Sequence, residues 1–166
     1  MMKKIIALLS ALFLCQLLAF CQINKEKVLD EINGWRSDNC LCGNVKKRPA
    51  GELIWDTKLE EVAQEYANEL AEENKKNETD FLYLSHVGTD GSTLKIRLEE
   101  KDYQVVYCVE NIAHLKGNES MVIDHWMNSP TACNNIMNRQ VTAMGMARSG
   151  DFWVLLLAQP KNFASK

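Results

Sequence analysis

The feature that most constrains the fold is an amphipathic helix pattern over residues 57–75. Apolar side chains recur at the spacing of one helix face, at Leu59, Val62, Ala63, Tyr66, Ala67 and Leu70. Asp56 precedes the pattern and is a residue type that caps helices. The opposite face carries a row of glutamates, which is typical of a solvated surface. We therefore predict a long helix whose apolar side must be covered by a second layer.

The rest of the chain predicts an α/β domain. Helices are expected over residues 25–36, 92–101 and 118–128, strands over 104–109, 141–147 and 152–158, a turn over 148–151 and a loop over 37–52. Asn24 should cap the first of these helices and Asn118 the last, and Trp35 should lie on the apolar face of the first. Pro130 should mark the end of the helix over 118–128. With 166 residues there is room for one domain of stacked layers.

The N-terminal segment has the pattern of a signal peptide. Lys3 and Lys4 precede an apolar run over residues 5–20, and Ala19 to Cys21 offers a cleavage site. The run is short for a membrane span, which needs about 20 residues. We expect residues 1–21 to be removed, residues 22–166 to form the domain, and the mature chain to lack a transmembrane span. The alternative is a lipid anchor on Cys21, which Phe20 disfavours because a small residue is expected there.

The charge balance argues against a nucleic-acid partner. Removing residues 1–21 takes away two lysines and leaves 17 basic residues against 22 acidic ones, a net charge of −5. The basic residues cluster only at 46–48. Nucleic-acid binding needs a larger group of lysines and arginines that neutralise phosphates. We therefore expect a secreted or periplasmic protein that does not bind nucleic acid.

Three short blocks in fixed order carry a family resemblance. They are LSHVGTDG at 84–91, VENIA at 109–113 and HWMNSPTACNNIM at 125–137. Together they resemble the CAP superfamily of cysteine-rich secretory, antigen 5 and pathogenesis-related proteins, which also includes many small bacterial secreted proteins. The resemblance extends over residues 27–158 and implies the three-layer α-β-α sandwich of that family.

The resemblance also implies a cleft, which in this chain lacks one residue. It places His86 and Glu110 in the central cleft, where some members hold a divalent metal. The family usually has a second histidine after a Ser-Pro-Gly sequence, and this chain has Ala132 there. His125 and Asp90 are the further candidates for the cleft, although a surface position and a turn-stabilising role are the simpler interpretations. A catalytic zinc needs three protein ligands, so a zinc site is doubtful.

No catalytic nucleophile is recognisable in the sequence. Ser129 lacks the Gly-x-Ser-x-Gly surroundings of a nucleophile elbow. Cys133 could in principle act with His86, but a structural role in a disulfide is the better interpretation. The sequence therefore gives no support for an enzyme.

Four cysteines lie beyond the predicted signal peptide: Cys40, Cys42, Cys108 and Cys133. An even number in an exported protein suggests disulfides. A bond between Cys40 and Cys42 is disfavoured because one intervening residue does not allow good geometry. The resemblance favours Cys42 with Cys133 and leaves Cys40 with Cys108. The alternative is that Cys40 and Cys108 are free.

Three functions remain in view. The first is a non-catalytic binding module, expected to be a monomer, for a small apolar molecule, a lipid or a peptide. The second is a metal-dependent or hydrolase-like activity centred on His86 and Glu110. The third is a structural protein of the cell envelope whose cleft is degenerate. The missing histidine at Ala132 favours binding over catalysis.

Overall fold

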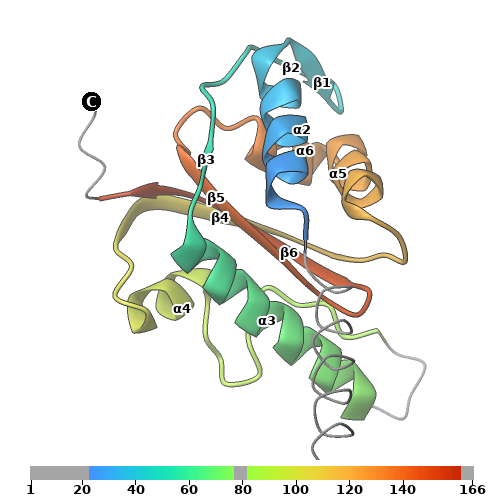
Figure 1. The fold of residues 1–166 in the computed structure, drawn as a ribbon, viewed down its shortest axis with the longest axis vertical. Coiled ribbons are helices and arrows are strands. Elements are labelled where there is room, and N and C mark those ends of the chain that lie inside the picture. Colours follow the sequence, from blue (N-terminus) through green and yellow to red (C-terminus); the bar gives the residue numbers. More distant parts are fainter. Residues whose placement is uncertain (1–22, 77–81, 162–166) are drawn as a thin grey trace, which may run out of the picture.

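A four-stranded sheet lies between two groups of helices (Figure 1). The computed structural model describes residues 23–76 and 82–161. The helices in this part of the chain are α2 (Lys25–Ser37), α3 (Thr57–Lys76), α4 (Leu94–Glu100), α5 (Glu119–Asn128) and α6 (Pro130–Ile136). The strands are β1 (Cys40–Cys42), β2 (Val45–Lys47), β3 (Ile54–Trp55), β4 (Val105–His114), β5 (Ala143–Ser149) and β6 (Phe152–Pro160). Helices α2, α5 and α6 lie on one side of the sheet, and α3 and α4 on the other, which confirms the predicted α-β-α sandwich.

The strands of the sheet follow the order β3-β5-β6-β4. Strand β3 is parallel to β5, and the other two pairings are antiparallel. The predicted hairpin joins β5 to β6 and turns at Gly150, whose φ is 59°. Strand β4 therefore forms one edge of the sheet, and β1 and β2 form a separate small hairpin.

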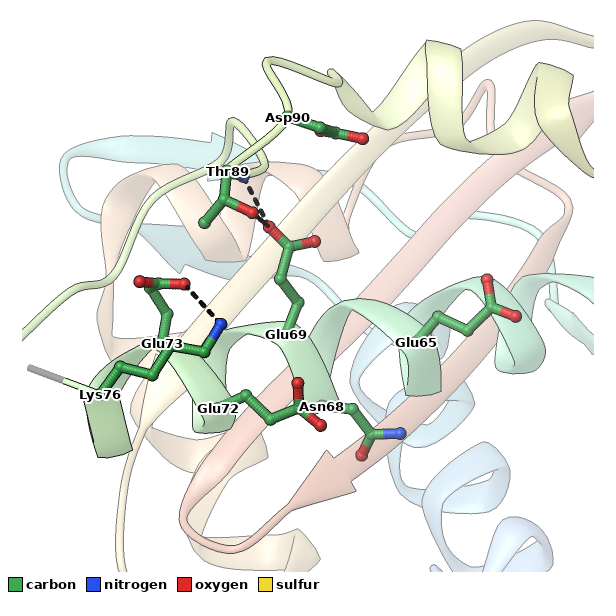
Figure 2. A pocket seen from close by; sticks show the side chains of 8 residues that line it. All are labelled: Glu65, Asn68, Glu69, Glu72, Glu73, Lys76, Thr89 and Asp90. Carbon is green, nitrogen blue, oxygen red and sulfur yellow. Dashed lines mark hydrogen bonds and ion pairs between the residues drawn. The ribbon is translucent and has the colours of Figure 1, made fainter.

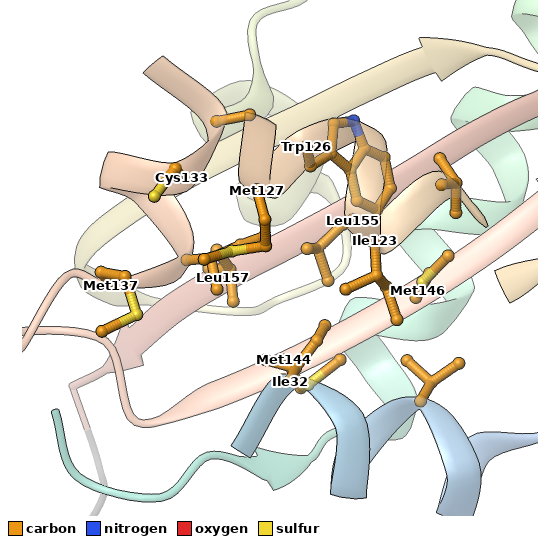
Figure 3. Close-up of a cluster of buried hydrophobic side chains, with 14 of the residues drawn as sticks. Ile32, Ile123, Trp126, Met127, Cys133, Met137, Met144, Met146, Leu155 and Leu157 are labelled. Carbon is orange, nitrogen blue, oxygen red and sulfur yellow. The ribbon is translucent and has the colours of Figure 1, made fainter. Parts of the chain in front are cut away.

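Strand alternation divides the interior into two apolar cores. The core under α2, α5 and α6 contains large residues such as Ile32, Trp126, Met144, Leu155 and Leu157 (Figure 3). The core under α3 and α4 contains Leu59, Tyr66, Leu98, Val154 and Leu156. Along β4, Cys108 and Ile112 pack on the α3 side, while Tyr107, Val109 and Ala113 pack on the α2 side. This register turns Glu110 toward α3 and α4, and its neighbour Asn111 toward α6.

The predicted helix caps are present. The side chain of Asn24 accepts a hydrogen bond from Lys27 N, and that of Asn118 accepts one from Met121 N. Asp56 accepts from the backbone amides of residues 58 and 59, at 2.8 and 3.1 Å. These side chains satisfy backbone donors that a helix start leaves unpaired. The long helix predicted over 57–75 is therefore confirmed as α3.

The protein has more secondary structure than the sequence predicted. The expected loop over 37–52 includes the β1–β2 hairpin, which a disulfide from Cys42 connects to α6. Strand β4 continues to His114 because it pairs with β6 along its full length. Pro130 follows the end of α5 as expected, but it also starts α6, where its missing N–H requires no partner.

The prediction for Trp35 was wrong. Trp35 is 39% exposed, and its neighbour Arg36 is buried in its place, together with Val28 and Ile32. Arg36 donates hydrogen bonds to the carbonyls of Gly51, Ile136, Asn138 and Val141. Burial lowers the pKa of Arg36 to about 10. A hydropathy pattern does not reveal this position, because carbonyls distant in sequence satisfy its charge.

None of the helices in the described residues is long and apolar enough to cross a membrane. The predicted signal peptide and the lipidation alternative at Cys21 lie outside the described residues.

Candidate functional site

Glu110 lies on the edge strand β4 and is buried on the α3/α4 side of the sheet. His86 belongs to the segment that connects α3 to α4. This segment is held to α3 at several points: Tyr66 O–H donates to the Ser85 carbonyl, and the Glu69 carboxylate accepts from Thr89 N and Oγ1, at 2.6 and 3.0 Å. The long helix and the edge strand therefore bring together two residues that are 24 positions apart in sequence.

The Glu110 carboxylate has a partner on each oxygen. Oε1 lies 2.7 Å from His86 Nδ1, and Oε2 accepts a hydrogen bond from Arg97 Nη2 at 2.6 Å. The side chains of Glu110 and Arg97 are 3% and 9% exposed, whereas that of His86 is 63% exposed. The arrangement is a buried ion pair with one imidazole at the surface. The predicted association of His86 and Glu110 is present in this structure.

Arg97 is the residue that the sequence analysis missed. Its guanidinium lies 3.6 Å from the centre of the Tyr66 ring, and Nη1 donates to the Ser92 carbonyl at 3.2 Å. Nε has no hydrogen-bond partner among the described residues. A signal was available, because Arg97 shares a helix face with the buried Leu94 and Leu98. An arginine at that position of an apolar face indicates a buried guanidinium whose charge is satisfied by other groups of the fold.

Asp90 stabilises the turn before α4. Its Oδ1 accepts from Ser92 N at 2.8 Å, and hydrogen bonds from Ser92 lower the pKa of the Asp90 carboxyl. Gly88 N donates to the Ser92 carbonyl in the same turn, and Gly91 has a φ of 85°. These contacts match the turn-stabilising interpretation of Asp90.

Ala132 lies on the other side of the sheet from Glu110. Its carbonyl accepts a hydrogen bond from Asn111 Nδ2 at 3.1 Å, and Asn135 Nδ2 donates to Asn111 Oδ1 at 2.8 Å. The methyl group of Ala132 is buried in the core under α5 and α6. Asn111 and Asn135 thus link the VENIA block to α6 through amide groups.

The remaining histidines are away from the ion pair. His125 is exposed on α5, in the helix layer opposite α3 and α4. His114 is exposed at the end of β4, with its ring centroid 4.5 Å from that of Phe152. Within residues 23–76 and 82–161, no hydrogen bond or ion pair joins either histidine to His86 or Glu110.

An acidic groove of about 400 Å³ lies between α3 and the turn at Thr89 and Asp90 (Figure 2). It is lined by Glu65, Asn68, Glu69, Glu72, Glu73, Lys76, Thr89 and Asp90. The Lys76 ammonium is 3.5 Å from the Glu73 carboxylate. The groove therefore has a net negative lining, formed by the helix face that the sequence predicted to be solvated.

One of the two predicted disulfides is present. Cys42 and Cys133 are bonded and connect β1 to α6. The pairing of Cys40 with Cys108 is absent, and the alternative holds: both are free in the described structure. Cys40 packs against the core under α2, and Cys108 against the core under α3, so the sheet separates them.

The donor atoms around Glu110 do not match a tight zinc site. Two candidate ligands meet there, His86 and Glu110, and Arg97 already binds one carboxylate oxygen. Ala132, where a second histidine was expected, supplies no side-chain donor and lies on the other side of the sheet from Glu110. In the part of the chain that the structure describes, the one group of three potential ligands with close donor atoms is Cys40, Cys42 and Cys133. A zinc site normally needs three or four protein ligands.

Part of the chain is similar in sequence to a known bacterial protein. The Bacillus subtilis (strain 168) protein YlbC, described as an uncharacterized membrane protein, is 29% identical over 100 residues, which cover 60% of this chain and 27% of that protein. The chain therefore spans about a quarter of that relative's length.

Three solved structures have the same fold. An extracellular SCP-domain protein from Bacillus anthracis str. Ames superposes with a TM-score of 0.66 at 23% identity, covering 81% of this chain and 39% of that one. An outer surface protein from Borrelia burgdorferi superposes with a TM-score of 0.58 at 26% identity, covering 68% of this chain and 80% of that one. A cysteine-rich secretory protein from Staphylococcus aureus subsp. aureus Mu50 superposes with a TM-score of 0.54 at 14% identity, covering 83% of this chain and 40% of that one.

The family assignment rests on the sequence match together with the fold. The model of the CAP family, described as the cysteine-rich secretory protein family, matches residues 29–154. That range contains the helix α3, the edge strand β4 and both cysteines of the disulfide. The chain therefore belongs to the CAP family.

Proposed function

We propose that this protein is an exported, non-catalytic binding module whose ligand contacts the surface around His86. The ligand is an apolar molecule: a lipid, a small apolar compound or an apolar peptide segment. The observation that carries the proposal is the Glu110 carboxylate, which is bound by His86 on one oxygen and by Arg97 on the other.

This arrangement makes Glu110 a poor catalyst. A general base needs a carboxylate oxygen that can reach a substrate proton, and a metal ligand needs an available lone pair. The Glu110 side chain is 3% exposed, and the neighbouring arginine neutralises its charge. Its role in the proposal is to orient the His86 ring, because a bond at Nδ1 leaves Nε2 for a polar group of the ligand.

The other candidates for catalysis have structural roles. Ser129 caps α6 by accepting a hydrogen bond from Ala132 N, and Cys133 is in the disulfide. Neither supplies the nucleophile that a hydrolase of the Ser-His or Cys-His type requires. Hydrolase-like or metal-dependent activity centred on His86 and Glu110 remains the alternative, and activity abolished in His86→Ala would support it.

Three apolar residues next to His86 support the proposed ligand class. Leu82, Leu84 and Val87 lie within four positions of His86, and these residues are 43%, 38% and 46% exposed. Apolar residues exposed together on one segment lose contact with water when they cover an apolar ligand. A histidine among them adds one polar contact that fixes the ligand's orientation.

A neutral apolar dye, N-phenyl-1-naphthylamine, tests this surface directly. We expect the purified wild-type protein to enhance its fluorescence saturably, and the Leu84→Ser/Val87→Ser variant to lose most of that signal. The matched control is Ile54→Ser/Met121→Ser, which removes apolar side chains that are also exposed, at 44% and 51%, but are elsewhere. An equal signal from all three proteins, or no binding by the wild type, would contradict the proposal.

Export is the second part of the proposal. The predicted signal peptide supports it, as does the similarity to an extracellular protein and to an outer surface protein. We propose a secreted or periplasmic monomer, with a lipid anchor through Cys21 as the alternative. The intact mass of the protein purified from its native envelope distinguishes these, since lipidation adds the mass of acyl chains and cleavage alone does not.

A further inference from the structure

A third sulfur atom lies beside the disulfide. The Sγ atoms of Cys40, Cys42 and Cys133 are all within 4.8 Å of one another. Cys42 and Cys133 form the bond, and Cys40 is a thiol. The fold brings these sulfurs together from distant parts of the chain, since residue 133 lies 91 positions after residue 42. The proposed binding function does not use this cluster.

The β1 strand explains why the thiol is there. Successive side chains of a strand point to opposite sides, so Cys40 and Cys42 share one side and Leu41 takes the other. Leu41 is 67% exposed, whereas Cys42 is buried and Cys40 is half-buried. The strand therefore directs the Cys40 thiol toward the disulfide that connects β1 to α6.

The Cys40 thiol is also accessible from outside. It lines a cavity of about 480 Å³ together with Glu31, Gly34, Trp35, Asp38 and Asn39. Solvent in this cavity can accept the thiol proton. A nucleophilic sulfur that can be deprotonated and a disulfide within a few ångströms are the two components of thiol–disulfide exchange.

We propose that these three cysteines form a thiol–disulfide exchange site, in which Cys40 attacks Cys133 and releases Cys42. The Cys40 thiol first gives its proton to solvent, and the thiolate forms a bond to Cys133 Sγ. The Cys42–Cys133 bond breaks, its electron pair leaves on Cys42, and Cys42 takes a proton from solvent. One disulfide and one thiol are present before and after, so no external oxidant is needed.

Attack on Cys133 is favoured over attack on Cys42. A bond between Cys40 and Cys42 would join residues two apart in an extended strand, where the Cα atoms are about 6.7 Å apart, near the upper limit for a disulfide. A bond between Cys40 and Cys133 still connects β1 to α6. After the exchange the free thiol is that of Cys42, which is buried, and no longer that of Cys40, which lines the cavity. External thiol reagents therefore no longer reach the free thiol of the folded protein.

The wild-type protein itself provides the main test. Oxidised full-length protein is incubated without reductant in mildly alkaline buffer, because burial raises the pKa of the Cys40 thiol. It is then alkylated under denaturing conditions, and fragment-ion mass spectrometry locates the label on each cysteine. We expect two species: Cys40 labelled with Cys42–Cys133 bonded, and Cys42 labelled with Cys40–Cys133 bonded. Label on Cys40 but never on Cys42, after prolonged incubation, would overturn the proposal.

Two variants extend the test. In Cys42→Ser, we expect Cys40 and Cys133 to be disulfide-bonded in the purified oxidised protein. In Cys40→Ser, the matched control, the Cys42–Cys133 bond should be retained and Cys42 should stay unlabelled however long the incubation. Unpaired Cys40 and Cys133 in a folded Cys42→Ser variant would likewise contradict the proposal.

Discussion

The two faces of the sheet each bury an arginine, but they satisfy its charge differently. On the α2/α5/α6 face, Arg36 donates only to backbone carbonyls, which are neutral groups. On the α3/α4 face, Arg97 pairs with the carboxylate of Glu110, which in turn contacts the exposed His86. The first arginine is sealed within a structural core. The second belongs to a chain of contacts that runs from the core to the surface.

Under the proposed function, this difference distinguishes the face that contacts the ligand from the face that is structural. The α2/α5/α6 face is further stabilised by a disulfide and by large apolar residues. A buried ion pair is weak evidence for stability, because apolar residues of similar size often stabilise as well or better. The Arg97–Glu110 pair therefore calls for another explanation. In our account, it holds the His86 ring at the edge of the sheet, where a ligand contacts it.

The largest expected effect is on the ion pair. Arg97→Met should lower the free energy of unfolding by about 3–5 kcal/mol, because it leaves the buried Glu110 carboxylate without its partner. Chemical denaturation measures the loss. Lys95→Met is the matched control: Lys95 and Glu99 are 3.7 Å apart and exposed, so their pair contributes at most about 1 kcal/mol.

A double variant sharpens this prediction. Arg97→Met combined with Glu110→Leu removes both charges, and we expect it to recover most of the stability lost in Arg97→Met. If the double variant is as unstable as the sum of the single ones, the two residues do not act as a pair.

The next effect concerns the other face. Reduction of the Cys42–Cys133 disulfide, or the substitution Cys133→Ser, should lower the free energy of unfolding by about 2–4 kcal/mol. The bond closes a long loop, and its loss increases the freedom of the unfolded chain. Thermal unfolding with and without reductant measures the change. An identical transition in both conditions would mean that this face does not depend on its disulfide.

Much of the fold could be predicted from the sequence because local patterns specified it. The period of α3, the caps at Asn24 and Asn118 and the turn between β5 and β6 all depend on residues close in sequence. The hairpin of β1 and β2 and the second half of β4 could not be predicted in this way. Both depend on pairing or bonding with distant segments, namely α6 and β6.

The site was predictable only in part for the same reason. His86 and Glu110 were identified from their motifs, and the structure brings them together. Arg97 was missed although it shares an apolar helix face with Leu94 and Leu98, a pattern that indicates a buried arginine but does not reveal which residue partners it. The Cys40–Cys108 pairing failed because the sequence does not reveal which side of the sheet each thiol occupies.

A third prediction concerns how closely α3 packs on the sheet. A Cβ added to Gly145 on β5 would lie 2.2 Å from Glu60 N and 2.4 Å from Leu59 C. These are backbone atoms that cannot move aside, so Gly145→Ala should destabilise the protein by about 1–3 kcal/mol or more. Gly34→Ala on α2 is the control from the other face: its Cβ would have no atom within 4 Å, and we expect a gain of about 0.5–1 kcal/mol. Similar effects in the two variants would refute the close packing.

The smallest effect appears in alkaline solution. Burial raises the pKa of the Tyr66 phenol, and burial together with a hydrogen bond to Asp56 raises that of Tyr103. The folded state thus keeps these protons above the ordinary tyrosine pKa of about 10, at which the unfolded state releases them. Below about pH 10 the two phenols are protonated in both states, so their titration should not change the free energy of unfolding. As the pH rises above about 10, the unfolded state loses these protons first, and the free energy of unfolding should fall.

Variants separate the two tyrosines. Tyr66→Phe and Tyr103→Phe should each reduce the alkaline slope of the stability curve, measured by denaturant unfolding at a series of pH values. An unchanged slope in both variants would show that the phenols on the α3/α4 face ionise as freely when folded as when unfolded.

The central claim is that Arg97 and His86 occupy both oxygens of the Glu110 carboxylate, so that the site binds its ligand without a metal and without catalysis. Zinc titration tests this claim most directly. Calorimetric titration of Zn²⁺ into the oxidised, metal-free protein should give no stoichiometric binding that depends on His86, so wild type and His86→Ala should give the same heats. One equivalent of zinc bound by the wild type and lost in His86→Ala would contradict the account and support a metal-dependent activity.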